Sequence, residues 1–236
     1  MRTETVTVPD GSFEQKVWLP ESGHGPGILL IQEIYGVGEY ITDVAEDLAG
    51  LGYVVAAPDL FWRLQPNWRA PHTEEGTRDS MGMVSRFDFA TGLDDLYAAF
   101  EHLQGLPETD GVPGTLGFCF GGTMAYLLAV RQGPSVVLSF YGSGVIDQLD
   151  GMGEIGVPIQ FHFGGSDPYI PREKVATVEE AVRDRPNAEI HVQEDAGHAF
   201  HNHASAMFHV PDAAERAWET AKGFLARHLP TSKNKG

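Results

Sequence analysis

The stretch Gly114–Ala129, GTLGFCFGGTMAYLLA, decides the fold. It begins as a short apolar segment, passes Cys119 between two glycines, and continues as an apolar helical pattern. The spacing Gly117-x-Cys119-x-Gly121 between a strand and a helix is typical of a nucleophile elbow, with sulfur in place of the usual serine oxygen. Such a turn is too sharp for a Cβ at the two flanking positions. The sequence therefore predicts a strand–turn–helix unit that presents Cys119 above a sheet.

Cys119 is the single cysteine of the chain. One cysteine cannot form an internal disulfide, so the fold does not depend on oxidation. A lone cysteine is most often a small buried hydrophobic residue, which is the alternative to a nucleophile here. The predicted position at a helix N-terminus favours the nucleophile, because the helix dipole and free N–H groups stabilise a thiolate and a developing oxyanion.

Apolar runs alternate with helical patterns on both sides of this unit. Strands are expected at residues 27–32, 53–57, 114–118, 135–140, 158–163 and 188–193, and helices at 40–51, 93–103, 121–131, 172–183 and 212–228. This alternation predicts an α/β fold with a mostly parallel sheet covered by helices on both faces. Residues 3–8 and 14–19 flank the turn sequence PDGS, which predicts an N-terminal β-hairpin.

We expect a single domain over residues 1–230 of the 236-residue chain. The region 61–86 has weak periodicity, two tryptophans and four arginines, and we interpret it as loops and short helices over the site. Residues 231–236 are polar, and a frayed tail is expected there.

The charge balance excludes some classes of partner. The chain has 16 basic and 33 acidic residues, a net charge of −17, so we expect neither nucleic-acid nor membrane binding. The N-terminal residues lack the apolar core of a signal peptide, and no apolar run approaches about 18 residues. A soluble cytoplasmic protein is the expectation.

An elbow nucleophile needs an acid and a histidine, in that chain order, at the ends of later strands. Asp167 follows the predicted strand 158–163 in a loop rich in glycine, and His198 follows the strand 188–193. Alone, either residue would be an ordinary loop residue. Together with Cys119 they predict a triad in which His198 accepts the thiol proton and Asp167 orients the imidazole.

We expect no metal and no cofactor. Four histidines cluster near the C-terminal end of the chain: His198, His201, His203 and His209. Their spacing is not a tight zinc signature, and no second cysteine supports one. No phosphate-binding or dinucleotide-binding glycine motif is present in the sequence.

Four short segments, spread over nearly the whole chain, resemble the dienelactone hydrolase family, the carboxymethylenebutenolidases, which have the α/β-hydrolase fold. They are QEIYG at 32–36, GFCFGG at 117–122, GGSDPYIP at 164–171 and DAGHAF at 195–200. The resemblance implies that Cys119, Asp167 and His198 form the catalytic triad. It also implies that Glu33 contacts the thiol in the resting enzyme and swings away when substrate binds. A carboxylate beside sulfur disfavours the thiolate, which makes this role physically reasonable; the alternative is a solvated loop glutamate.

The family resemblance also indicates an oxyanion hole. Its two donors would be the backbone N–H of Phe120, directly after the nucleophile, and that of Ile34 in the loop after an earlier strand.

Family members that cleave dienelactone hold its carboxylate with two arginines. Arg78 is the candidate for the first, with Arg86 less well placed. Where the second is expected the sequence has His201 and Asn202, so we assign Asn202 to the substrate site. Loss of a guanidinium removes a permanent charge and a bidentate fork, so affinity for a carboxylated lactone should fall.

Arg63 or Arg69 could substitute for the missing guanidinium. Among the aromatic residues that could line an apolar pocket, Tyr141 and Phe200 are assigned to substrate binding. About half of such aromatics are instead ordinary core residues.

We therefore expect a hydrolase that cleaves a small ester or enol-lactone through an acyl-enzyme on Cys119. Its partner would be a small-molecule substrate, and the protein would be a monomer or small homo-oligomer. The alternatives are a broader carboxylesterase or thioesterase for uncharged acyl substrates, favoured by Asn202, and a non-catalytic binding protein with the same fold.

Overall fold

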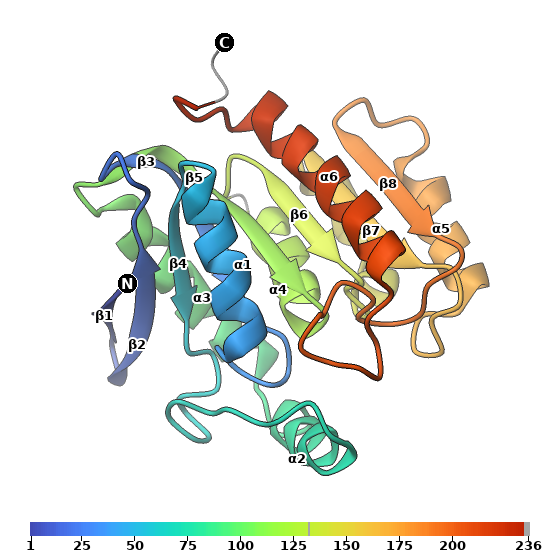
Figure 1. The fold of residues 1–236 in the computed structure, drawn as a ribbon, viewed down its shortest axis with the longest axis horizontal. Coiled ribbons are helices and arrows are strands. Elements are labelled where there is room, and N and C mark those ends of the chain that lie inside the picture. Colours follow the sequence, from blue (N-terminus) through green and yellow to red (C-terminus); the bar gives the residue numbers. More distant parts are fainter. Residues whose placement is uncertain (132, 234–236) are drawn as a thin grey trace.

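One mixed sheet of eight strands runs through the protein, whose computed structural model describes residues 1–131 and 133–233 (Figure 1). The strand order is β1-β2-β4-β3-β5-β6-β7-β8. The strands are β1 (Arg2–Val8), β2 (Gly11–Trp18), β3 (Gly25–Ile31), β4 (Val54–Pro58), β5 (Thr109–Phe118), β6 (Val137–Phe140), β7 (Ile159–Gly164) and β8 (Ala188–Gln193). β1 pairs antiparallel with β2, and β2 with β4, whereas the remaining pairs are parallel. The expected N-terminal hairpin and mostly parallel sheet are confirmed.

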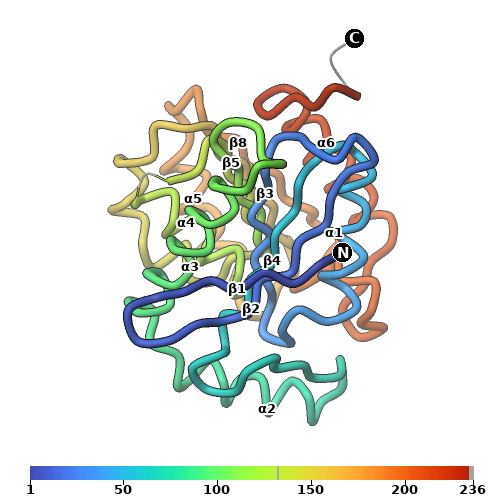
Figure 2. The backbone as a smooth tube through the Cα atoms, turned by 90° about the vertical axis from the view of Figure 1, so that its left-hand side faces the viewer, coloured from blue at the N-terminus to red at the C-terminus, as the bar shows by residue number. Residues whose placement is uncertain are grey.

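Helices cover both faces of this sheet, which gives the molecule three layers (Figure 2). α1 and α6 lie on one face, and α3, α4 and α5 lie on the other, while α2 lies beyond the layered body at the bottom of both views. The helices are α1 (Glu39–Gly50), α2 (Glu74–Val84), α3 (Phe89–Gln104), α4 (Phe120–Val130), α5 (Arg172–Val182) and α6 (Pro211–His228), with short 3₁₀ helices η1 (Val145–Asp147) and η2 (Leu149–Glu154). Within the described residues, no helix combines the length and apolar composition needed to cross a membrane.

The central strands are buried because each carries an uninterrupted apolar run. All five residues of β4 are buried, whereas β8, at the edge of the sheet, is half-buried throughout. α1 packs Ile41, Val44 and Leu48 into the core, as its periodicity predicts. The parallel strands bring the loops after β3, β5, β7 and β8 to one edge of the sheet, where ligand sites of such folds are found.

The region 61–86 contains a full helix rather than only short ones. Turns lead to α2, whose N-terminus is capped by the Thr73 hydroxyl, which accepts the Gly76 N–H at 3.1 Å. The apolar pattern of this region is weak because only three residues of α2 are buried: Gly76, Ser80 and Met83. The rest of the helix faces solvent or the cavities described below.

The C-terminal tail is anchored at its start, which differs from the frayed tail expected over 231–236. Thr231 is buried, and its hydroxyl donates to the Leu51 carbonyl at 3.0 Å. Lys233 Nζ donates to the Gly50 carbonyl at 2.9 Å. The remaining part of that expectation, 234–236, lies outside the described residues.

Candidate active site

Cys119 occupies a strained turn between the central strand β5 and α4. Its φ of 54° and ψ of −115° lie in a region that residues with a Cβ rarely adopt. Its N–H donates to the Phe140 carbonyl at 2.9 Å, which ties the turn to β6. A Cβ on Gly117 would collide with the Gly121 carbonyl, and a Cβ on Gly121 would lie 2.5 Å from the Gln32 carbonyl oxygen. This close approach explains the two glycines of the predicted elbow.

Three loops bring the predicted triad residues into hydrogen-bonding contact. Cys119 Sγ lies 3.1 Å from His198 Nε2, and His198 Nδ1 lies 2.7 Å from Asp167 Oδ2. The other oxygen, Asp167 Oδ1, accepts the backbone N–H groups of Tyr169 at 2.7 Å and Ile170 at 3.1 Å. The carboxylate is therefore fixed by its own loop, and Oδ2 is left to accept the N–H of the imidazole.

The surroundings of His198 favour its charged form. Burial by itself lowers the pKa of the imidazole. The negative charge of a Cys119 thiolate and the hydrogen bonds with Asp167 and Cys119 outweigh burial and raise the pKa of His198 to about 10. An imidazolium beside sulfur stabilises a thiolate, the form of cysteine that acts as a nucleophile.

The two residues predicted to supply the oxyanion donors, Ile34 and Phe120, lie beside Cys119. Phe120 is the first residue of α4, so its N–H has no carbonyl partner within the helix. Ile34 lies in the loop after β3, and both residues line a cavity together with Cys119. The indole N–H of Trp68 donates to the Ile34 carbonyl at 3.2 Å, which ties this loop to the region 61–73.

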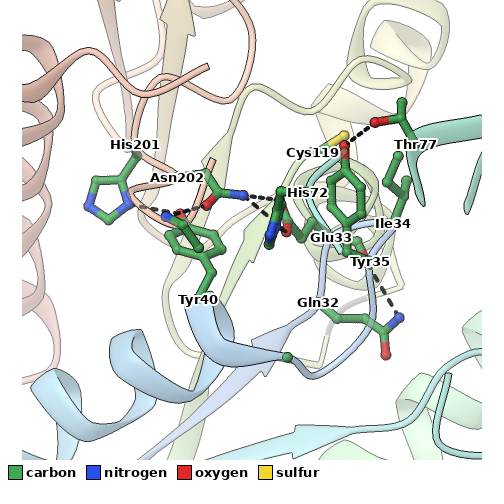
Figure 3. Close-up of polar contacts among 12 residues, drawn as sticks. Gln32, Glu33, Ile34, Tyr35, Tyr40, His72, Thr77, Cys119, His201 and Asn202 are labelled. Carbon is green, nitrogen blue, oxygen red and sulfur yellow. Dashed lines mark hydrogen bonds and ion pairs between the residues drawn. The ribbon is translucent and has the colours of Figure 1, made fainter. Parts of the chain in front are cut away.

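Glu33 is buried beside the site and is held by two side chains (Figure 3). Asn202 Nδ2 lies 3.1 and 3.0 Å from the two carboxylate oxygens, and His72 Nε2 lies 2.8 Å from Oε1. The Cys119 thiol contacts His198 instead. This differs from the resting contact between Glu33 and the thiol that the family resemblance implied. The reason is that Asn202 and His72 engage both carboxylate oxygens.

Two cavities meet at the Cys119 thiol. We call the first the imidazole-side cavity; it has a volume of about 150 Å³ and includes His198, Tyr169 and Phe208 in its wall. The second, the helix-side cavity, has a volume of about 300 Å³. Its wall consists of Ile34, Met81, Val84, Phe89, Cys119, Phe120, Thr123, Leu127, Ser143, Gly144, Asp147 and Gln148.

Comparison with known proteins identifies the family. The model of the dienelactone hydrolase family matches residues 13–229. The chain belongs to this family. Membership makes the protein a hydrolase, in agreement with the expectation from its sequence motifs.

Individual relatives of the dienelactone hydrolase family match over the full length. The carboxymethylenebutenolidase of Pseudomonas putida is 31% identical over 230 residues, covering 96% of this chain and 97% of that protein. The carboxymethylenebutenolidase of Pseudomonas sp. (strain P51) is 31% identical over 234 residues, covering 98% of each. The crystal structure of a candidate dienelactone hydrolase from Klebsiella pneumoniae superposes with a TM-score of 0.84 at 24% identity, covering 96% of this chain and 98% of that one. The α/β-hydrolase fold is thereby confirmed.

The residues assigned to substrate binding lie outside the walls of the two cavities. Tyr141, Phe200 and Asn202 are fully buried beneath the site. The Tyr141 ring packs edge-on against His198 at 5.3 Å and against Phe200 at 5.4 Å, so these aromatics support the loop that contains His198. Asn202 binds Glu33, and Arg78 lies exposed on α2. Their assignment to direct substrate contacts stays a prediction.

The other arginines of the middle region lie outside the walls of the two cavities. Arg63 is bound to Asp95 and Asp10, with its Nε 2.8 Å from Asp95 Oδ2 and its Nη1 2.6 Å from Asp10 Oδ2. Arg86 Nε donates to a carbonyl of its own helix region. Arg69 lines a different hollow, outside both walls described above.

Two of the three remaining clustered histidines have separate hydrogen-bond partners. His201 Nδ1 lies 2.8 Å from the Tyr40 hydroxyl, and His203 Nε2 lies 2.8 Å from Asp43 Oδ2. Burial, together with the neighbouring His203 and His209, lowers the pKa of His201 to about 3. The hydrogen bond between His201 and the Tyr40 hydroxyl fixes the segment that follows His198.

Several residues in or beside the two cavities were not identified from the sequence. His72 is a loop histidine with no motif around it, and Met81 and Phe208 belong to segments with weak apolar patterns. Tyr169 could have been found, because it lies two residues after Asp167 in a loop that must reach the site. Tyr35 also lies in the wall of the imidazole-side cavity.

Proposed function

We propose that the protein hydrolyses uncharged esters or lactones through an acyl-enzyme on Cys119. The observation that carries this proposal is the contact of 3.1 Å between the thiol and His198 at the junction of two cavities. Among the described residues, neither cavity wall contains Arg or Lys, and the acidic residues present are Glu33 and Asp147. A carboxylated substrate would therefore meet like charge with no guanidinium or ammonium in either wall to pair with it.

In the proposed reaction, His198 Nε2 accepts the thiol proton while Asp167 holds Nδ1–H. The thiolate attacks the carbonyl carbon, and the oxyanion accepts the N–H groups of Ile34 and Phe120. The alcohol leaves with the proton from His198, which gives a thioester on Cys119. Water then attacks the thioester, with His198 as general base, and the acid is released as the thiol is restored.

Charge on the substrate tests this proposal. We expect the methyl ester of dienelactone, whose ring is identical but whose carboxylate is masked, to be opened with a kcat/KM at least about tenfold higher than dienelactone itself, since about 1.4 kcal/mol of repulsion is removed. The measurement follows ring opening by absorbance for the cis and trans isomers, with phenyl acetate as a neutral acyclic comparison. Faster turnover of the free carboxylates would contradict the choice of uncharged substrates.

The clamp on Glu33 gives a second prediction. If His72 keeps the Glu33 carboxylate from the thiol, His72→Phe should slow alkylation of Cys119 by iodoacetamide about three- to tenfold, because a released carboxylate can approach sulfur and disfavour the thiolate. The double variant Glu33→Gln/His72→Phe should recover the rate, since it has no carboxylate to release. Labelling is followed by mass spectrometry.

His72→Gln is the matched control for this clamp, because its amide can still donate to Glu33. Its alkylation rate should stay within about twofold of the parent protein. If His72→Phe labels as fast as the parent protein, His72 has no part in positioning Glu33.

A further inference from the structure

The geometry points to the helix-side cavity as a binding site for the acyl chain of the substrate. The preferred substrates would then be acyclic esters whose acyl chain is of medium length and carries no charged group. This inference rests on the proposed hydrolysis at Cys119 and assigns the two sides of the ester to different cavities.

The position of His198 decides which cavity takes which side. A general acid must reach the oxygen of the leaving alcohol within hydrogen-bonding distance. His198 belongs to the wall of the imidazole-side cavity and is absent from that of the helix-side cavity. The alcohol part therefore lies toward Tyr169 and Phe208, and the acyl part extends into the helix-side cavity.

The helix-side cavity has the shape needed for a chain. Thr123 and Leu127 are spaced by four residues, so they lie along one side of α4, and Cys119 directly precedes the first residue of this helix. At a rise of 1.5 Å per residue, the step from Phe120 to Leu127 spans about 10 Å. The cavity therefore follows α4 for about two turns, starting at the nucleophile.

The wall of this cavity also exposes apolar surface that a ligand would cover. Met81 is 53% exposed and Phe89 is 42% exposed, and both lie in the wall with Val84 between them in sequence. Large apolar side chains gathered in one exposed hollow are typical of a binding site. Asp147 is the acidic residue of the wall, and it disfavours an acyl chain that ends in a carboxylate.

A chain-length series tests the acyl site. From p-nitrophenyl acetate through butyrate to hexanoate, kcat/KM should rise about two- to fourfold for each added methylene, the gain expected for burying apolar surface. Leu127→Trp fills the far part of the cavity, so it should remove this dependence on chain length while acetate remains a substrate. Leu127→Ala should shift the preference to longer chains, and thermal unfolding of both variants shows whether they are folded.

Phe208→Ala is the matched control, because it alters the opposite cavity. It should preserve the dependence on acyl length and change the preference among alcohols of a fixed acyl group. The assignment of the acyl site would be wrong if folded Leu127→Trp kept the dependence of kcat/KM on chain length. It would also be wrong if the parent protein showed no such dependence.

Covalent labelling separates this inference from the proposed function. In alkyl chloromethyl ketones the Cys119 thiolate displaces chloride and forms a thioether, so labelling requires no ester hydrolysis. The labelling rate should rise with the alkyl chain in the parent protein and not in Leu127→Trp. If labelling depends on chain length but the protein hydrolyses no ester, the hydrolase proposal is wrong and the acyl-chain site is supported. If the protein hydrolyses esters but neither turnover nor labelling depends on chain length, the hydrolase proposal is supported and the acyl-chain site is wrong.

Discussion

Cys119→Ala should lower kcat/KM for p-nitrophenyl butyrate by at least about 1,000-fold, because it removes the atom to which the acyl group would be transferred. The residual rate would come from the oxyanion donors and binding alone. Cys119 is only partly buried and the change removes a single sulfur atom, so the variant should fold as the parent protein does. A thioester adduct on the peptide that contains Cys119, trapped by acid quench and detected by mass spectrometry, should be present only in the parent protein.

Activated esters also react with surface imidazoles, so the experiment needs a control for background cleavage. His24 is an exposed histidine paired with Asp110, and it lies just before β3, at the opposite end of that strand from the site. His24→Gln should therefore retain full activity. If Cys119→Ala hydrolyses the ester as fast as His24→Gln, Cys119 is not the nucleophile and the proposed mechanism is wrong.

Gly121→Ala should lower the free energy of unfolding by about 3 kcal/mol, at the upper end of what an overpacked site costs. The added Cβ would lie 2.5 Å from the Gln32 carbonyl oxygen and would also collide with the Ile31 carbonyl. Both are backbone atoms at the end of β3, so neither can turn aside as a side chain would. Relief would require β3 and α4 to separate, which would also displace Ile34 and its N–H from the nucleophile. Urea unfolding measures the loss of stability.

Gly223→Ala is the control for this substitution, because Gly223 lies in α6 and, among the described residues, only Arg227 Nη1 comes near an added Cβ, at 3.7 Å. There the change should stabilise the protein by about 1 kcal/mol through helix propensity. Equal stability of Gly121→Ala and the parent protein would contradict the close approach of α4 to β3.

The sequence predicts the framework and the triad because each rests on a local pattern. The strand of residues 27–32 is an apolar run, and the G-x-C-x-G spacing describes a turn whose geometry depends on its own residues. Asp167 and His198 follow from chain order on such a framework. The partners of Glu33 could not be predicted, because His72 and Asn202 meet it only through the tertiary fold.

The apolar and charged residues that contact the substrate are harder to predict from the sequence, for another reason. A tyrosine or phenylalanine such as Tyr141 has the same pattern whether it lines a cavity or lies under one, and only packing distinguishes the two. Arg78 lies on a helix with little apolar periodicity, so its sequence does not tell which side faces the site.

The single thiol has a consequence for exposure to peroxides. A cysteine that is accessible from a cavity and paired with an imidazolium is readily oxidised to a sulfenic acid. Because the chain has no other cysteine, no intramolecular disulfide can form to intercept that state before it proceeds to the irreversible sulfinic acid. Recovery of the oxidised protein therefore depends on a reducing thiol supplied by its surroundings.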